Sequence, residues 1–172
     1  QDPGTTDAAV ALISEVAAKG RLLELASGTG RITIPLAQLG YDVTGIEGSP
    51  DMVATMHAKR GGEDIPVIIG DMADVAVDGS FSHVCLIYNT LFNLLSAQEQ
   101  QQCLIRCAES LAPGGHIIVD CFIPSPDMPE HSGPTPHRSS SRGYITSEVH
   151  VNKAEQLIDG VFIEVVDEQA VR

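Results

Sequence analysis

The run Leu22-Leu23-Glu24-Leu25-Ala26-Ser27-Gly28-Thr29-Gly30 constrains the fold more than any other part of this chain. An apolar stretch of strand length leads into a glycine-rich turn, after which a helix is expected. Glycine lets the backbone approach a bound molecule closely, and the acidic Glu24 stands just before the turn. A second apolar run ends at Glu47, where a carboxylate is suited to accept hydrogen bonds from ribose hydroxyls. The pattern predicts a nucleoside-binding crevice.

The spacing of the small residues bears on which nucleoside is bound. A dinucleotide fingerprint has a third small residue, whereas the series here runs Gly28, Gly30, Thr33. A pyrophosphate prefers a helix start without a nearby carboxylate, and Glu24 would repel it. The sulfonium and ammonium groups of S-adenosylmethionine suit Glu24 better, which favours this cofactor over NAD. The alternative is a glycine turn that only links a strand to a helix.

The charge balance restricts the partners. The chain of 172 residues has a formal net charge of -13 and only 10 Lys and Arg residues, which form no cluster. Nucleic-acid binding rests largely on basic side chains that neutralise phosphates, so we expect no nucleic-acid partner and a small-molecule substrate instead. No apolar run approaches the ~20 residues of a membrane span, so we expect no membrane partner either.

The cysteines and histidines give no metal-binding pattern. Cys85 and Cys121 lie in apolar runs, and Cys103 and Cys107 are four positions apart on an expected helix. This spacing differs from that of zinc ligands, and the six histidines are scattered. We therefore expect no metal site and read the cysteines as buried small side chains in a reducing, cytoplasmic compartment.

Apolar runs alternate with helical patterns along residues 1–123. Asp7 is expected to cap a helix that ends near Lys19, Ser49-Pro50 to start another, and Ser96 with Glu99 to form a capping box. Strands are expected at residues 22–25, 42–46, 66–69, 83–87 and 116–122, with a turn at Pro113-Gly114-Gly115. Because these strands are continuously apolar, they predict a parallel sheet covered on both faces, a doubly wound α/β fold.

The composition changes after Ile123. Residues 124–142 contain five prolines and five serines, so we expect a Pro/Ser-rich loop over residues 124–143. Two strand-like runs follow, at residues 144–151 and 161–166, joined through Ile158-Asp159-Gly160. They predict an antiparallel hairpin within residues 144–172.

Several motifs, in order, resemble those of the class I S-adenosylmethionine-dependent methyltransferases. Residues 24–30 resemble the family's first motif, E/D-x-G-x-G-x-G, and Glu47 ends the second strand as expected. The remaining motifs are Gly70-Asp71-Met72, Tyr88-Asn89-Thr90-Leu91-Phe92-Asn93 and Leu111-Ala112-Pro113-Gly114-Gly115. The resemblance covers residues 22–123, and the ordered set is far more specific than any one motif. Ala26 replaces the family's first glycine and costs about 1 kcal/mol if the position requires a positive φ.

The resemblance implies a Rossmann-like domain over residues 1–123 and a role for each matching residue. The backbone of residues 26–30 would hold the methionine end of the cofactor, Glu24 would orient that loop or meet the ammonium, and Glu47 would bind the ribose. Asp71 and the Met72 backbone would read the adenine, and Met52 would pack on it or lie in the core. The implied cofactor site is Glu24, Ala26, Ser27, Gly28, Gly30, Glu47, Met52, Asp71, Met72 and Tyr88. The acceptor would arrive at Tyr88, Asn89 and Asn93.

The implied reaction is methyl transfer to a small-molecule acceptor by in-line displacement. In one subgroup, which includes sugar N-methyltransferases, an antiparallel sheet follows the fifth strand, and residues 144–166 resemble it; this suggests a homodimer. The family's sixth and seventh strands are missing here, so we expect the chain to be a piece of a longer enzyme. The alternatives are an NAD(P)-dependent oxidoreductase and a non-catalytic protein that binds S-adenosylmethionine for regulation.

Overall fold

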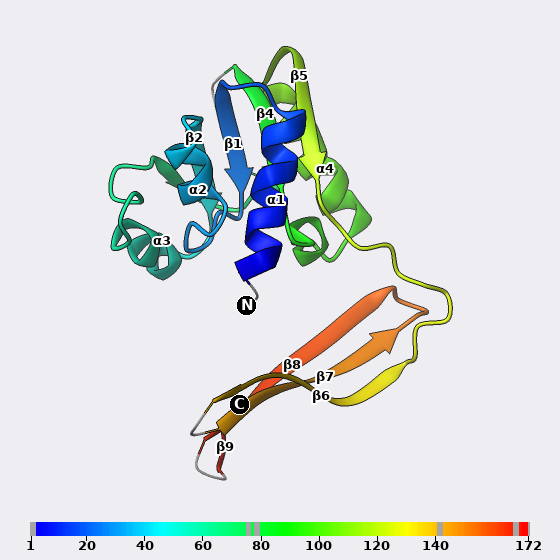
Figure 1. Ribbon diagram of the computed structural model, residues 1–172. Helices are drawn as coiled ribbons and strands as arrows, with labels where there is room; N and C mark the ends of the chain where they lie inside the picture. Colours follow the sequence, from blue (N-terminus) through cyan, green and yellow to red (C-terminus); the bar gives the residue numbers. More distant parts are fainter. Residues whose placement is uncertain (1–2, 75–76, 78–79, 141–142, 167–168, 172) are drawn as a thin grey trace. The chain divides into compact units, whose positions relative to one another are not determined.

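The computed structural model describes residues 3–74, 77, 80–140, 143–166 and 169–171 (Figure 1). The chain divides into two compact units, Gln1–Phe122 and Ile123–Arg172. The first is a parallel α/β unit and the second an antiparallel sheet.

The first unit is built on a five-stranded sheet in the order β3-β2-β1-β4-β5. Its neighbouring strands pair in parallel, which confirms the doubly wound α/β fold. The chain winds outward from β1 to β3 on one side and then returns to β4 and β5 on the other. Ligands bind at the carboxyl ends of the strands, at the point where such an order reverses. The strands are β1 (Arg21–Leu25), β2 (Asp42–Glu47), β3 (Val67–Ile69), β4 (Phe81–Leu86) and β5 (Leu111–Val119).

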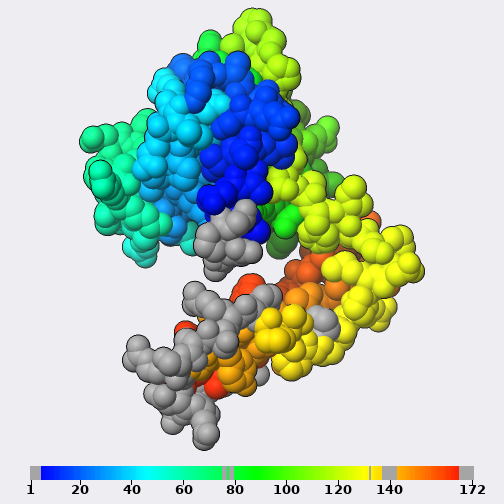
Figure 2. Space-filling view, viewed as in Figure 1, coloured from blue at the N-terminus to red at the C-terminus, as the bar shows by residue number. Residues whose placement is uncertain are grey.

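Helices cover both faces of this sheet. On one face, α1 and α2 enclose an apolar core with Leu22, Val43 and Cys85 of the strands, and Figure 2 shows these two helices side by side. On the other face, Cys103 and Cys107 of α4 pack against the apolar side chains of β1 and β4. The helices are α1 (Pro3–Val16), α2 (Thr33–Gln38), α3 (Pro50–His57), the 3-10 turn η1 (Thr90–Asn93) and α4 (Ala97–Ser110).

Two predicted helix starts are confirmed. The Ser49 side chain accepts a hydrogen bond from the Met52 backbone, and Pro50 is the first residue of α3. Ser96 and Glu99 form the capping box of α4, in which each side chain bonds to the other's backbone N–H. Both signals depend on residues within one turn, which explains why the sequence alone reveals them.

Three expectations in this unit are wrong. Helix α1 includes Pro3, so Asp7 lies inside the helix and does not cap it. Strand β5 begins at Leu111 and runs through the expected turn, where its register against β4 shifts and Gly114 has a φ of 81°. Because β5 ends at Val119, Cys121 lies beyond it and is exposed, whereas the other three cysteines are buried.

The second unit is a four-stranded antiparallel sheet in the order β6-β7-β8-β9. The predicted hairpin is present as β7 (Gly143–Asn152) and β8 (Leu157–Val166), but residues 158–160 pair within β8 and the turn falls at residues 153–156. The expected loop over residues 124–143 contains β6 (His131–Ser140), which pairs with β7; β9 (Gln169–Val171) adds a further strand. Cross-strand hydrogen bonds stabilise β6 even though it contains Pro134 and Pro136.

Candidate functional site

The carboxyl ends of β1 and β2 are joined through the side chain of Glu47. One of its oxygens accepts a hydrogen bond from Gly28 N at 2.7 Å, and the other accepts one from Ser49 N at 2.9 Å. The side chain is 8% exposed. Each carboxylate oxygen has a further lone pair, so Glu47 can still accept hydrogen bonds from a ligand. Glu47 and the glycine turn are thus brought together as the sequence predicts.

The turn after β1 bends through a series of left-handed residues. Ala26, Gly28 and Gly30 have φ angles of 52°, 57° and 79°. Glycine adopts this conformation without cost, but alanine at position 26 does so at a cost of about 1 kcal/mol. A side chain on Gly30 would lie 2.5 Å from Met56 Cγ, so close packing as well as conformation requires glycine there. Ser27 N donates to Ile46 O at 3.0 Å, which fixes the turn against β2.

The Glu24 side chain contacts the start of α2, just after this turn. Its carboxyl accepts a hydrogen bond from the Thr33 hydroxyl, and the residue is 4% exposed. Burial raises the pKa of Glu24 from 4.5 to about 8, although the Thr33 hydrogen bond and the charge of Arg31 act in the opposite direction. At neutral pH the group is therefore mostly protonated. The electrostatic preference for a cationic cofactor, inferred above from an ionised Glu24, has no basis in this structure.

The residues expected at the adenine end lie in the first turn of α3 and in the turn after β3. Met52 is 46% exposed, and its sulfur would lie 3.8 Å from a side chain on Gly28, so the alternative that Met52 belongs to the core is wrong. Gly70 N donates to Glu47 O at 3.1 Å, which places the turn after β3 next to Glu47. In that turn Asp71 is exposed and accepts from Ala73 N at 2.8 Å, while the Met72 side chain is buried in the core.

Tyr88 and Asn89, which follow β4 after Ile87, are held in a strained conformation by residues just after β5. Both have a φ of 61°, which is rare for residues other than glycine. Asp120 accepts from Tyr88 N through its side chain at 3.1 Å and from Asn89 N through its carbonyl at 3.0 Å. The Asn89 side chain in turn accepts from Phe122 N at 2.7 Å. These three hydrogen bonds, named here the β4–β5 latch, stabilise two consecutive left-handed residues.

Next to the latch, η1 and the chain after β5 present aromatic side chains. Phe92 and Phe122 meet edge to face, with ring centroids 5.7 Å apart, and they are 37% and 39% exposed. Asn93 is exposed at the end of η1, and among the described residues no hydrogen bond joins it to Tyr88 or Asn89.

Sequence reasoning missed three residues that shape the site. Thr33 stands where a dinucleotide site has a small residue, and its hydroxyl satisfies Glu24. Arg31 places its guanidinium 3.5 Å from the centroid of the Tyr88 ring. Asp120 organises the latch. The only available signals were local: Thr33 breaks the glycine spacing, Arg31 follows Gly30, and Asp120 follows an apolar strand.

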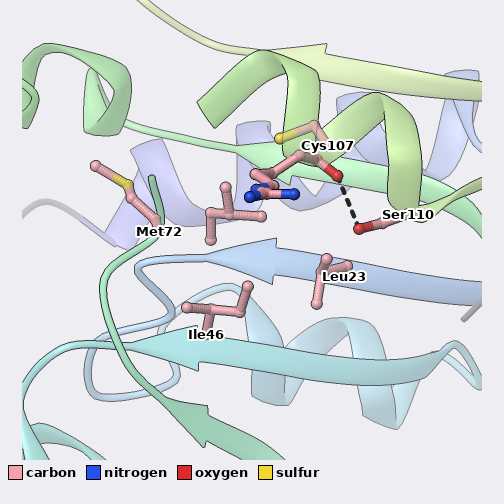
Figure 3. A pocket seen from close by; sticks show the side chains of 7 residues that line it. Leu23, Ile46, Met72, Cys107 and Ser110 are labelled. Carbon is pink, nitrogen blue, oxygen red and sulfur yellow. Dashed lines mark hydrogen bonds between the residues drawn. The ribbon is translucent and has the colours of Figure 1, made fainter. Parts of the chain in front are cut away.

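The remaining features give no second candidate. The cavity in Figure 3 lies between the sheet and α4, lined by Leu23, Leu25, Ile46, Met72, Arg106, Cys107 and Ser110, and it has no room for a water molecule. Within the described ranges, no three His, Cys, Asp or Glu side chains gather to hold a metal ion. In the same part of the chain, no helix is long and apolar enough to cross a membrane.

Comparison with known proteins identifies related chains. The model of a family described as "Methyltransferase domain" matches residues 22–115. Over 105 residues the chain is 33% identical to cypemycin N-terminal methyltransferase of a Streptomyces species. The matched region covers 60% of this chain and 42% of that protein. It is 31% identical over 99 residues to a Streptomyces venezuelae dTDP-3-amino-3,4,6-trideoxy-alpha-D-glucopyranose N,N-dimethyltransferase, covering 58% of this chain and 41% of that enzyme. The chain thus spans about two fifths of the length of these relatives.

A solved structure extends the similarity to both units. The CcbJ methyltransferase from Streptomyces caelestis superposes with a TM-score of 0.87 and 26% identity, covering 99% of this chain and 70% of that one. The likeness therefore includes the antiparallel sheet that follows the fifth strand.

Proposed function

The chain belongs to the class I S-adenosylmethionine-dependent methyltransferase family, and from that premise we propose that the protein transfers a methyl group to a small-molecule acceptor. The observation that carries the proposal is the Glu47 carboxylate, which links the glycine turn after β1 to the end of β2. A carboxylate in that position can accept both hydroxyls of a ribose. The family match gives no support to the oxidoreductase or the non-catalytic alternative.

The described residues fit the cofactor. Ala26, Gly28 and Gly30 have left-handed backbone conformations. Ala26 and Gly28 are partly exposed, whereas Gly30 is buried against Met56. In the proposal this backbone holds the methionine end and Glu47 binds the ribose. Asp71 uses one carboxylate oxygen to accept from Ala73 N; in the proposal its other oxygen accepts from the adenine amino group, and Met52 covers the ring next to Gly28.

The acceptor side of the proposed site is the β4–β5 latch. Asn89 uses its side-chain oxygen to accept from Phe122 N, which leaves its amide N–H groups to donate to a polar group of the acceptor. Phe92 and Phe122 provide an apolar wall that excludes water from one side. Tyr88 is part of the latch, and Asn93 is the last residue of η1, which follows it.

Methyl transfer requires mainly that the protein position the two reactants. S-adenosylmethionine would supply a methyl group bonded to a sulfonium; a nitrogen, oxygen or carbon atom of the acceptor would bond to that methyl in line as the carbon–sulfur bond breaks and S-adenosylhomocysteine leaves. The chain's residues hold the two reactants in line and exclude water, which is where much of the catalysis arises. A general base is needed only if the acceptor's nucleophile arrives protonated. We propose further that the protein acts in the cytoplasm.

Calorimetric titration with S-adenosylhomocysteine tests the proposal, with NAD as the competing ligand. We expect micromolar binding of S-adenosylhomocysteine, no comparable binding of NAD, and a loss of at least about a hundredfold in Glu47→Ala, because two charge-assisted hydrogen bonds disappear. Glu47→Gln retains the shape of the side chain and separates loss of contact from collapse of the turn.

Glu63→Ala is the matched control, because the exposed Glu63 carboxylate also accepts from a backbone N–H, that of Gly61, in the loop after α3. We expect its affinity to equal that of the wild type. Tighter binding of NAD, or no binding by a chain shown to be folded, would overturn the proposal.

A further inference from the structure

A carboxylate stands at the acceptor side of the crevice. Asp120 directly follows Val119, the last residue of β5, and β5 is the neighbour of β4 in the sheet. In the β4–β5 latch it accepts from the backbone N–H groups of Tyr88 and Asn89, and its own N–H donates to Leu86 O at 2.9 Å. These hydrogen bonds fix the backbone of Asp120 at the carboxyl ends of the two strands.

Only one oxygen of this carboxylate is engaged within the described part of the chain. Oδ2 accepts from Tyr88 N at 3.1 Å, and no hydrogen bond from another described residue reaches Oδ1. None of the described basic side chains forms an ion pair with Asp120, whereas Asp42 and Glu109 each pair with an arginine. Asp120 is exposed, so a ligand can reach Oδ1. The carboxylate is therefore anchored through one oxygen and able to accept from a ligand through the other.

Hydrogen bonds bring two aromatic rings to the same place. Asn89 O accepts from Phe92 N at 2.9 Å, and the Asn89 side chain accepts from Phe122 N at 2.7 Å. The two phenylalanine rings meet edge to face and remain partly exposed. Phe122 is also only two positions along the chain from Asp120. A carboxylate beside exposed aromatic rings favours a cation, because the opposite charge and the faces of the rings both attract it.

The charge of Asp120 is not neutralised by the described residues. Arg31 lies 3.5 Å from the centroid of the Tyr88 ring, but no ion pair joins it to Asp120. The whole chain has a formal net charge of -13, which attracts cations to its surface over a longer range. An acceptor that brings a positive charge to the latch supplies the partner that this carboxylate lacks.

We propose that Asp120 binds a basic amine of the methyl acceptor, so that the substrate class of this site is an amine-bearing small molecule. The inference rests on the proposed function and narrows its acceptor. An amine or its ammonium form donates a hydrogen bond to Oδ1 of Asp120. The amide N–H groups of Asn89 remain for a second polar group of the same molecule, and the rings of Phe92 and Phe122 contact its apolar part.

The contact also suits the proposed methyl transfer. An acceptor ammonium first releases a proton to water, which frees the lone pair of the nitrogen. The nitrogen then bonds to the methyl carbon as the carbon–sulfur bond breaks, and the electron pair of that bond stays on the sulfur of the departing S-adenosylhomocysteine. The positive charge thereby moves from sulfur to nitrogen. A carboxylate at the nitrogen stabilises this charge as it develops, which lowers the barrier more than it stabilises the neutral amine.

The test compares two probes of similar size that differ in charge. Benzylamine is a cation at neutral pH, whereas benzyl alcohol has the same ring and no charge. Both are titrated by ligand-observed NMR into the chain saturated with S-adenosylhomocysteine. We expect the wild type to bind benzylamine about fivefold to tenfold more tightly than benzyl alcohol. Asp120→Asn keeps an oxygen for Tyr88 N but removes the charge, so we expect it to abolish this preference and to leave the affinity for benzyl alcohol within about twofold.

Asp42→Asn is the matched control. Asp42 is also an exposed aspartate at the end of a strand of the same sheet, but it is the first residue of β2 and therefore lies at the amino edge. The substitution removes the same charge, and we expect the affinities for both probes to equal those of the wild type. Binding of S-adenosylhomocysteine reports that each variant keeps a folded cofactor site.

Each failure has a different meaning. Equal weakening of both probes in Asp120→Asn would show that Asp120 acts only through the structure of the latch. A wild type that binds S-adenosylhomocysteine but neither probe, or that shows no preference for benzylamine, would show that the latch does not select an amine. Any of these results overturns this inference alone. If the folded wild type does not bind S-adenosylhomocysteine, the proposed function fails and the inference fails with it.

Discussion

An arginine lies over an aromatic ring at the amino ends of the strands of the five-stranded sheet, and another does so at their carboxyl ends; among the described residues, only the first forms an ion pair. At the amino ends of the strands, Arg21 lies 4.6 Å from the Phe81 ring and 3.6 Å from Asp42. At the carboxyl ends, Arg31 lies 3.5 Å from the Tyr88 ring, and no ion pair joins it to another described residue. The first arrangement is complete within the chain, whereas the second leaves donors for a ligand.

The backbone differs between the two edges in the same way. At the amino edge, left-handed conformations fall on Gly40 and Gly114, where they cost little. At the carboxyl edge they also fall on Ala26, Tyr88 and Asn89, where each is unfavourable. Strain of this kind is concentrated at ligand sites, so the comparison supports the proposed site at the carboxyl edge independently of any motif.

The largest expected effect is a pH dependence of opposite sign at the two edges. Burial raises the pKa of Glu24 from 4.5 to about 8, so between these values the folded chain holds a proton that the unfolded chain has released. Stability therefore falls as pH rises through this window, by about 1.4 kcal/mol per pH unit at most. Glu24→Gln should abolish this slope in urea denaturation at a series of pH values.

His83 at the amino edge provides the opposing case. Burial lowers the pKa of His83 below 6.5. At pH values just below 6.5, the His83 side chain is therefore protonated in a larger fraction of the unfolded chains than of the folded ones. Stability from His83 therefore rises with pH up to about 6.5 and is lost in acid, and His83→Phe should remove that loss. If Glu24→Gln retains the wild-type slope between pH 5 and 8, the burial of a protonated Glu24 is wrong.

A second comparison uses two left-handed glycines. At Gly30 the φ is 79°, and an added Cβ would lie 2.5 Å from Met56 Cγ. At Gly40 the φ is 89°, and an added Cβ would have no non-neighbouring atom of the described residues within 4 Å. Gly30→Ala should cost about 2–4 kcal/mol of unfolding free energy, from strain and overpacking together. Gly40→Ala should cost about 1 kcal/mol, from strain alone. Equal costs in chemical denaturation would contradict the tight packing assigned to the glycine turn.

The smallest expected effect has a favourable sign. Ala26→Gly removes the strain of a φ of 52° and should stabilise the chain by about 0.5–1 kcal/mol, after the greater flexibility of glycine in the unfolded state is subtracted. Ala108→Gly, on the exposed face of α4, should instead destabilise by about 1 kcal/mol. A shift of the thermal midpoint in the same direction for both variants would remove Ala26 from the strained residues.

The sequence alone determined the features that depend on near neighbours. The capping residues Ser49 and Ser96 act within one turn, and the apolar runs need only a short window, so the parallel sheet and both helix starts were predictable. The glycine turn and Glu47 also followed from residue type and spacing. These signals are local because the hydrogen bonds and side-chain periodicity behind them are local.

Only the tertiary structure decided which groups are charged, strained or paired. Glu24 becomes protonated because α2 covers it, and β6 forms in a proline-rich segment because β7 lies beside it. Arg31 meets Tyr88 only when β1 and β4 become neighbours. Burial and contact energies depend on segments that are distant along the chain, so they cannot be predicted from the residues near each position.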